Sequence, residues 1–180
     1  IEPEVPEDAY LQWIGTYDLT DKNGLTYRIT LHDVDPNYMY AVTGWECGEG
    51  LKYDFTNILG SEVYFFAYYN NGRLEFCEEY ITALPVTDNS GTKHDTDFGL
   101  YGYCDFDGEA GLVLTNGSVL ATAEYATGDI TVNGVELEFQ DGSVSSVCGL
   151  GYAAMLSDGS GNYFPFNGPT ILPYTLSKVE

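Results

Sequence analysis

The sequence predicts an all-β protein, an antiparallel β-barrel of eight or more strands with little helix. Three observations support this fold class. Apolar and polar residues alternate with a period of two along much of the chain, Asn-Gly turn sequences separate alternating segments, and helix-forming patterns are scarce. With 180 residues, 44% of them apolar, the chain is long enough for one domain with a substantial core.

The expected strands follow one another along the chain. Tyr27, Ile29 and Leu31 alternate with polar neighbours, so two sets of side chains lie on opposite faces of one strand. Further strands are predicted at Tyr38–Trp45, Lys52–Thr56, Glu62–Tyr69, Arg73–Tyr80, Phe98–Phe106, Gly111–Leu114, Asp129–Val132, Val135–Gln140, Val144–Met155 and Ile171–Val179.

Turn chemistry connects several of these strands. Hairpins are predicted at Asp21–Gly24, at Asn70–Gly72 and at Asn133-Gly134, because Asn and Gly accept the positive φ of tight turns. Val119–Ala126 is the one stretch that favours a short helix, with a strand or a loop as the competing interpretation. The polar stretch Val86–Asp97 is predicted to be a long loop, either a flap over a barrel mouth or a solvated connection.

Charge restricts the partners that the chain can have. Six Lys and Arg against 28 Asp and Glu give a formal net charge of -22, which repels nucleic acid and anionic lipid. Aromatic residues make up 15% of the chain, more than a disordered acidic chain would carry. The longest apolar runs are too short to span a bilayer, so we expect no direct membrane insertion of this region.

The first residues differ in character from the rest. Residues 1–9 form an acidic, Pro/Glu-rich stretch, which is typical of a linker, and residues 10–180 are expected to form a single barrel domain. Such a linker and so acidic a surface indicate an exported protein at the cell surface or in the periplasm. A lipid anchor on a segment upstream of the linker would tether it there.

Two parts of the chain carry a family resemblance. The first runs from Tyr10-Leu-Gln-Trp13-Ile-Gly15-Thr-Tyr17 through Thr26–Leu31 to Val42-Thr43-Gly44-Trp45, and the second is Leu172–Leu176. Together they resemble the lipocalin-like (calycin-type) β-barrel domains of exported Bacteroidetes lipoproteins. Relative to the lipocalin signature, Tyr17 stands in the place of a Trp and Lys178 is the cation on the last strand. The resemblance implies structural roles for Trp13, Gly15, Tyr17 and Trp45.

Tyrosines are the candidate ligand-binding residues. Alternation puts Tyr101 and Tyr103 on one strand face, and Tyr64 and Tyr68 on one face of another strand. Aromatic rings near carboxylates or amides are a common surface for stacking sugars or for holding amphipathic ligands. Core packing and simple β-propensity predict the same enrichment in tyrosine.

Motifs for catalysis or metal binding are absent from the sequence. Neither His32 nor His94 is linked to a nucleophile, and no catalytic residue, metal ligand or cofactor is assigned. The acidic pairs that a glycan hydrolase would need are candidates only by abundance: Glu78-Glu79, Asp105 with Asp107, and Asp33 with Asp35. The acidic stretches Asp105–Glu109 and His94–Asp97 do not match a calcium loop.

Four cysteines are spaced too widely for a CxxC motif. Cys47, Cys77, Cys104 and Cys148 allow two disulfides in any of three connectivities, or thiols at half-buried strand positions.

The expected function is therefore that of a non-enzymatic ligand-binding or interaction module for carbohydrates or small amphipathic ligands. The alternatives are a carboxylate-based glycan hydrolase and a purely structural module of a surface lipoprotein. An open barrel mouth lined by aromatic residues would favour binding, facing carboxylates in a cleft would favour hydrolysis, and a filled barrel would favour the structural role.

If Trp13 and Tyr17 seal one end of the barrel, Trp13→Ala should lower the free energy of unfolding by about 3–5 kcal/mol, because burial is lost and a cavity remains. Chemical denaturation measures this change. An unchanged denaturant midpoint would mean that the Trp13 side chain is exposed.

Overall fold

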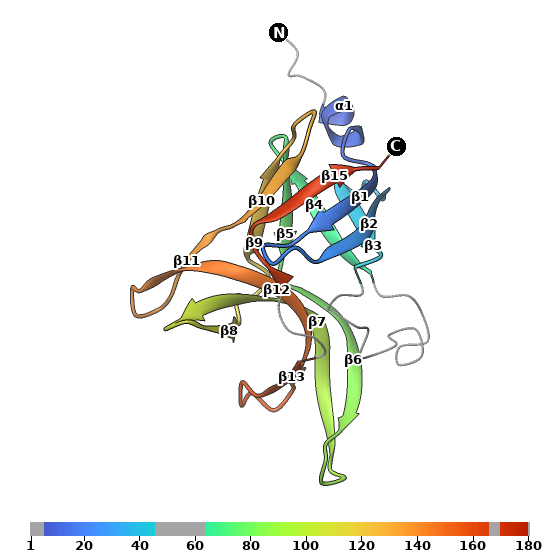
Figure 1. The fold of residues 1–180 in the computed structure, drawn as a ribbon. Helices are drawn as coiled ribbons and strands as arrows, with labels where there is room; N and C mark the ends of the chain where they lie inside the picture. The colour runs from blue at the N-terminus through green and yellow to red at the C-terminus, as the bar shows by residue number, and fades with distance from the viewer. Residues whose placement is uncertain (1–5, 46–63, 166–169, 180) are drawn as a thin grey trace.

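The computed structural model describes residues 6–45, 64–165 and 170–179, and within them the protein is all-β and antiparallel (Figure 1). One short helix, α1 (Pro6–Leu11), precedes the strands. The strands are β1 (Gly15–Thr20), β2 (Thr26–Asp33), β3 (Met39–Thr43), β4 (Phe65–Asn70), β5 (Arg73–Cys77), β6 (Glu79–Thr87), β7 (Lys93–Phe106), β8 (Glu109–Val113), β9 (Val119–Glu124), β10 (Ile130–Gly134), β11 (Glu136–Glu138), β12 (Val144–Leu156), β13 (Tyr163–Pro165), β14 (Thr170–Ile171) and β15 (Tyr174–Lys178).

Eight strands close into a barrel in the order β1-β15-β10-β9-β5-β4-β3-β2. The predicted antiparallel barrel is thus confirmed. The order is an up-and-down meander that the chain leaves twice. After β5 it runs through β6–β8 before returning as β9, and after β10 it runs through β11–β14 before β15 closes the barrel against β1.

Both excursions build a second sheet, in which β12 and β7 form the central pair. β6 and β8 pair with β7, while β11, β13 and β14 pair with β12. The two long strands bend midway, so that one half of this sheet lies beneath the barrel and the other half runs away from it (Figure 1).

Aromatic side chains fill the barrel. Trp45 is 2% exposed, and its ring lies 5.5 Å from Phe65, 6.3 Å from Phe76 and 5.6 Å from Tyr174, measured between centroids. These rings continue into the second sheet, because Phe65 contacts Tyr152 of β12. One hydrophobic core therefore joins the barrel to the inner face of the second sheet.

Two of the three predicted hairpin turns are confirmed. Asn71 and Gly72 join β4 to β5 with φ of 52° and 84°, the left-handed conformation for which these residues are suited. Between β1 and β2, Oδ1 of Asp21 accepts hydrogen bonds from the backbone nitrogens of Asn23 and Leu25, which holds that turn closed.

The third predicted turn is wrong. Asn133 and Gly134 belong to β10, where they pair with Thr122 and Ala121 of β9. Gly134 is needed for a different reason: a Cβ there would lie 1.9 Å from the carbonyl oxygen of Val147. The glycine therefore permits the close approach of β12 to the barrel.

Val119–Ala126 forms strand β9 and its turn, so the helical interpretation is wrong. Leu120, Ala121 and Ala123 are buried, and Ala121 lies opposite Phe76 of β5. A small residue leaves room for that large ring, and strand pairing on both sides outweighs the helix propensity of alanine.

Three other boundaries differ from the prediction. The loop predicted at Val86–Asp97 is a short turn, because β6 extends to Thr87 and β7 begins at Lys93. Arg73–Tyr80 is split between β5 in the barrel and β6 in the second sheet. Residues 6–9, assigned to the linker, lie in α1. The strand predicted at Lys52–Thr56 lies outside the described residues.

Gly134→Ala should destabilise the fold by about 1–3 kcal/mol, because the new methyl group must push β10 away from the backbone of β12. Gly128→Ala is the matched control, since a Cβ at Gly128 meets no atom within 4 Å. Urea unfolding of both variants measures the difference. Equal stability of the two would contradict the close contact at Gly134.

Candidate functional site

The predicted tyrosines do not form one site. Tyr101 and Tyr103 lie on the same face of β7 in the second sheet, and they are 6% and 3% exposed. Tyr68 lies on β4 of the barrel, and Tyr64 lies just before that strand with 49% of its surface exposed.

Tyr101 is packed into the second sheet. With Ala153 and Met155 it forms a small hydrophobic cluster, against which Leu112 and Tyr163 pack. Its hydroxyl donates a hydrogen bond to the carbonyl oxygen of Asp97, and burial raises its pKa to about 12. The Tyr103 hydroxyl is also buried, and the described residues provide it with no hydrogen-bond partner. These two rings present little surface to a ligand.

Trp13 and Tyr17 lie at the end of the barrel that carries α1. Both side chains are fully buried, and the Tyr17 hydroxyl donates a hydrogen bond of 2.7 Å to the carbonyl oxygen of Trp13. The ammonium group of Lys178 lies 5.8 Å from the centre of the Tyr17 ring and donates to the carbonyl oxygen of Gln12. Gly15 provides the space for this side chain, because a Cβ there would lie 2.9 Å from Cε of Lys178.

A groove opens beside this end of the barrel, between the β9–β10 turn and the last residues of β15. Its volume is about 470 Å³. It is lined by Tyr17, Tyr125, Ala126, Thr127, Gly128, Asp129, Ile130, Ser177, Lys178 and Val179. The turn and the end of β15 lie near α1 in Figure 1. We call this hollow the terminal groove.

The terminal groove combines an aromatic wall with polar groups. Tyr125 is partly exposed, and its ring packs edge-on against Trp13 at 5.3 Å, which fixes its position. Lys178 supplies an ammonium group and Asp129 a carboxylate, while Thr127 and Ser177 supply hydroxyls. This mixture of one ring face with several hydrogen-bonding groups suits small polar ligands.

Sequence reasoning missed the terminal groove. Tyr125 and Asp129 lie in the β9–β10 turn. The sequence pattern leaves Tyr125 open between helix, strand and loop, places Asp129 at the start of a strand, and marks Lys178 only as the cation of the last strand. A turn that carries both an aromatic residue and a carboxylate was the available signal. The proximity of β15 to that turn depends on the closure of the barrel and has no local sequence signal.

At least one member of each acidic pair accepts hydrogen bonds from within the fold. Oε2 of Glu78 accepts from the backbone nitrogen and the hydroxyl of Thr115, and Oε2 of Glu79 accepts from the backbone nitrogen of Phe66. Asp33 accepts from the Tyr10 hydroxyl, and Asp105 accepts from the backbone nitrogen of Gly108. Glu78 and Glu79 thus bind different segments of the chain, at the point where it crosses from barrel to second sheet. Within the described ranges, no group of three His, Cys, Asp or Glu side chains is placed to hold a metal ion.

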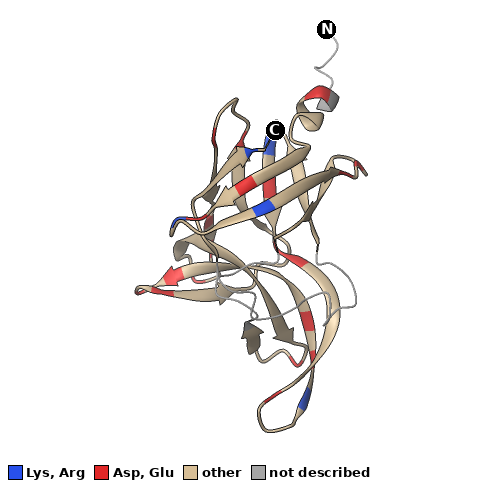
Figure 2. Cartoon of the chain, turned by 45° about the vertical axis from the view of Figure 1, so that its right-hand side comes forward, with Lys and Arg blue, Asp and Glu red and all other residues tan. Residues whose placement is uncertain are grey.

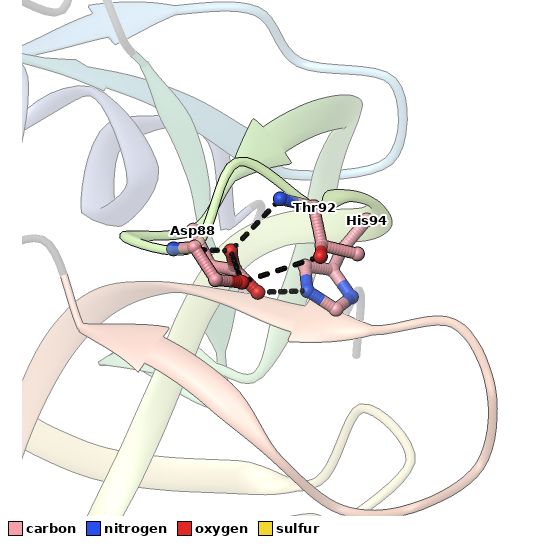
Figure 3. Close-up of polar contacts among 4 residues, drawn as sticks. Asp88, Thr92 and His94 are labelled. Carbon is pink, nitrogen blue, oxygen red and sulfur yellow. Dashed lines mark hydrogen bonds and ion pairs between the residues drawn. The ribbon is translucent and has the colours of Figure 1, made fainter.

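His94 belongs to a polar cluster at the β6–β7 turn. Figure 3 shows the Asp88 carboxylate facing the backbone nitrogen of Thr92 and the ring of His94. The hydroxyl of Ser90 also donates to this carboxylate. These hydrogen bonds lower the pKa of Asp88, and the bond from Ser90 has the largest effect, followed by that from His94. The Asp88 carboxylate therefore stabilises the β6–β7 turn, and the cluster has a structural role in this hairpin.

Charge is distributed without a basic patch in the part of the chain described. Figure 2 shows Asp and Glu on both the barrel and the second sheet, whereas Lys and Arg are few and scattered. No helix in the described ranges has the length and apolar character needed to cross a bilayer.

Comparison with known proteins found no relative. Neither family models, nor curated proteins, nor solved structures match this chain. Its function has therefore to be inferred from its own residues and their geometry.

The half-buried Glu79 makes stability depend on pH. Burial raises its pKa from 4.5 to about 7, although the hydrogen bond from Phe66 opposes this shift. Because the folded state favours the protonated acid, the stabilisation is complete below about pH 4.5 and is lost as the pH rises through 7.

Glu79→Gln removes this titration and keeps an acceptor for the Phe66 nitrogen. Between pH 4.5 and 8 the wild-type protein should lose about 1–2 kcal/mol relative to the variant, less than the full pKa difference implies, because solvent screens the partly exposed carboxylate. Guanidinium unfolding at several pH values measures this loss, with Glu124→Gln, an exposed glutamate of β9, as the control for the change in net charge. Parallel pH profiles of wild type and Glu79→Gln would contradict it.

Proposed function

We propose that this chain is a non-enzymatic, exported ligand-binding module of lipocalin-like type, and that it binds carbohydrates or other small polar ligands in the terminal groove. The up-and-down order of the barrel strands supports the lipocalin-like part of the proposal. The net charge of -22 supports a role at the cell surface or in the periplasm, with neither nucleic acid nor anionic lipid as a partner.

The observation that carries the proposal is the terminal groove beside a filled barrel. Among the described residues, Trp45 and its aromatic neighbours occupy the barrel interior, so the proposal places the ligand outside it, in contrast to lipocalins that enclose one. Outside it, the Tyr125 ring offers a face for the C–H groups of a sugar, and Asp129, Lys178 and the nearby hydroxyls offer hydrogen bonds to its polar edge.

The arrangement of the carboxylates supports binding without turnover. Asp129 is the one acidic side chain among the described residues that line the groove, so the second acid of a glycoside-hydrolase pair is missing there. Glu78 and Glu79 are held by backbone groups at the junction of the two sheets. A carboxylate-based glycan hydrolase is therefore the weaker alternative.

The second candidate is a purely structural module, and the filled interior favours it. A barrel packed with aromatic residues and joined through one core to a second sheet is a rigid body, suitable for positioning another domain. This alternative needs no ligand in the groove.

Tyr125→Ala should weaken sugar binding about tenfold or more, because the stacking face of the groove is lost. Calorimetry with neutral and uronic-acid-containing oligosaccharides measures the affinity, and a parallel assay for released sugar measures turnover. Tyr64→Ala is the matched control, since Tyr64 is exposed and does not line the groove.

The other outcomes separate the alternatives. Loss of binding in Tyr64→Ala but not in Tyr125→Ala would move the site to the predicted tyrosines of the barrel. Sugar release that disappears in Asp129→Asn would establish an enzyme. No binding across the whole panel would leave the structural module as the function.

A further inference from the structure

Cys104 and Cys148 come together where β7 pairs with β12. In that ladder Cys104 lies opposite Val147, and the next aligned pair is Tyr103 with Gly149. Between these two aligned pairs, β7 moves on by one residue and β12 by two. Cys148 is therefore the extra residue of a β-bulge.

The bulge places the two cysteines, both free thiols in this structure, across from each other in the β7–β12 ladder. In a bulge, two residues of one strand oppose a single residue of the other, so Val147 and Cys148 both oppose Cys104. Aligned Cα atoms of antiparallel strands are about 4.5–5.5 Å apart and disulfides span about 4.4–6.8 Å, so Cys148, next in the chain to the aligned Val147, is the candidate partner of Cys104. Two neighbouring segments hold the bulge in place. The backbone nitrogen of Leu172 donates to the carbonyl oxygen of Cys148, and that of Val147 donates to the carbonyl oxygen of Val135.

The electrostatics of the two thiols agree with this proximity. Burial, and after it the charge of Cys104, raises the pKa of the Cys148 thiol. Burial also raises the pKa of Cys104, whose side chain is fully enclosed, whereas Cys148 remains partly exposed. Cys148 is therefore the thiol that a reagent in solution meets first.

We propose that Cys104 and Cys148 are a reversible disulfide site that ties β7 to β12 at the bulge. The oxidant is a soluble disulfide, such as oxidised glutathione. The Cys148 thiolate attacks one of its sulfurs and expels a glutathione thiolate, which leaves a mixed disulfide on Cys148. The Cys104 thiolate then attacks the Cys148 sulfur and expels the second glutathione thiolate. Two protein thiols lose two protons and two electrons, and the S–S bond of the oxidant is reduced to two thiols.

Cys77 is the matched control. It is also a half-buried thiol on a strand, but it lies on β5, opposite Val119 of β9. Burial, and after it the charges of Glu75 and Glu79, raises the pKa of this thiol, with no contribution from another cysteine. Cys77→Ser should therefore leave the pair intact, whereas Cys148→Ala should abolish it.

The test equilibrates the full chain with reduced or oxidised glutathione, blocks free thiols with iodoacetamide and digests after glutamate. Cleavage sites at Glu109, Glu124, Glu136 and Glu138 separate the two cysteines, so a bridge appears in the mass spectrum as a linked peptide pair. We expect that pair in the wild type and in Cys77→Ser, with a higher urea midpoint after oxidation. In Cys148→Ala, oxidation should leave the midpoint unchanged.

Two results would overturn the proposal: linkage of Cys104 or Cys148 to another cysteine, or alkylation of both thiols after incubation with oxidised glutathione. If Cys148→Ala fails to fold, the mass spectrum of the wild-type protein decides between the bridge and free thiols without it.

Discussion

The fold depends on a chain of aromatic contacts that closes one end of the barrel. Trp45 packs against Phe65, Phe65 against Tyr152, and Tyr152 stacks on Phe98 at 5.5 Å between ring centroids. The first two belong to the barrel side of the core and the last two to the second sheet. Because one core serves both sheets, neither can bury its apolar face without the other.

This shared core occupies the barrel interior with aromatic side chains, and the polar groups of the terminal groove lie at the opposite end. Beside α1 the barrel ends in Trp13, Tyr17 and the side chain of Lys178, which lies across the Tyr17 ring. The turn between β9 and β10 extends past this closed end. The terminal groove between that turn and β15 thus results from the way in which the barrel closes. Its polar and aromatic groups come mainly from the turn residues, above all Tyr125 and Asp129.

Alternation and turn chemistry were sufficient to predict most of the barrel strands, but they left β9 open between helix, strand and loop and could not separate one sheet from the other. β7 and β12 are buried on both faces in their central parts, so their local pattern is compatible with either sheet. Asn133-Gly134 has the sequence of a turn, yet the approach of the Val147 carbonyl makes it part of a strand. Tyr101 alternates correctly with its neighbours, but its burial depends on Met155 and Tyr163, more than 50 residues away. The terminal groove has the same long-range origin.

The meander order has a consequence for folding. β1 has its final partner only when β15 arrives, and the register that joins Tyr17 to Lys178 closes a loop of nearly the whole chain. The first excursion separates β5 from its partner β9 in the sequence, and the second separates β10 from its partner β15. Folding of this chain is therefore dominated by contacts between distant residues, which belongs to the slow end of single-domain kinetics and leaves strand edges unpaired while it proceeds. The net charge of -22 makes such intermediates repel one another. The acidic residues therefore counteract aggregation during folding as well as in the folded state.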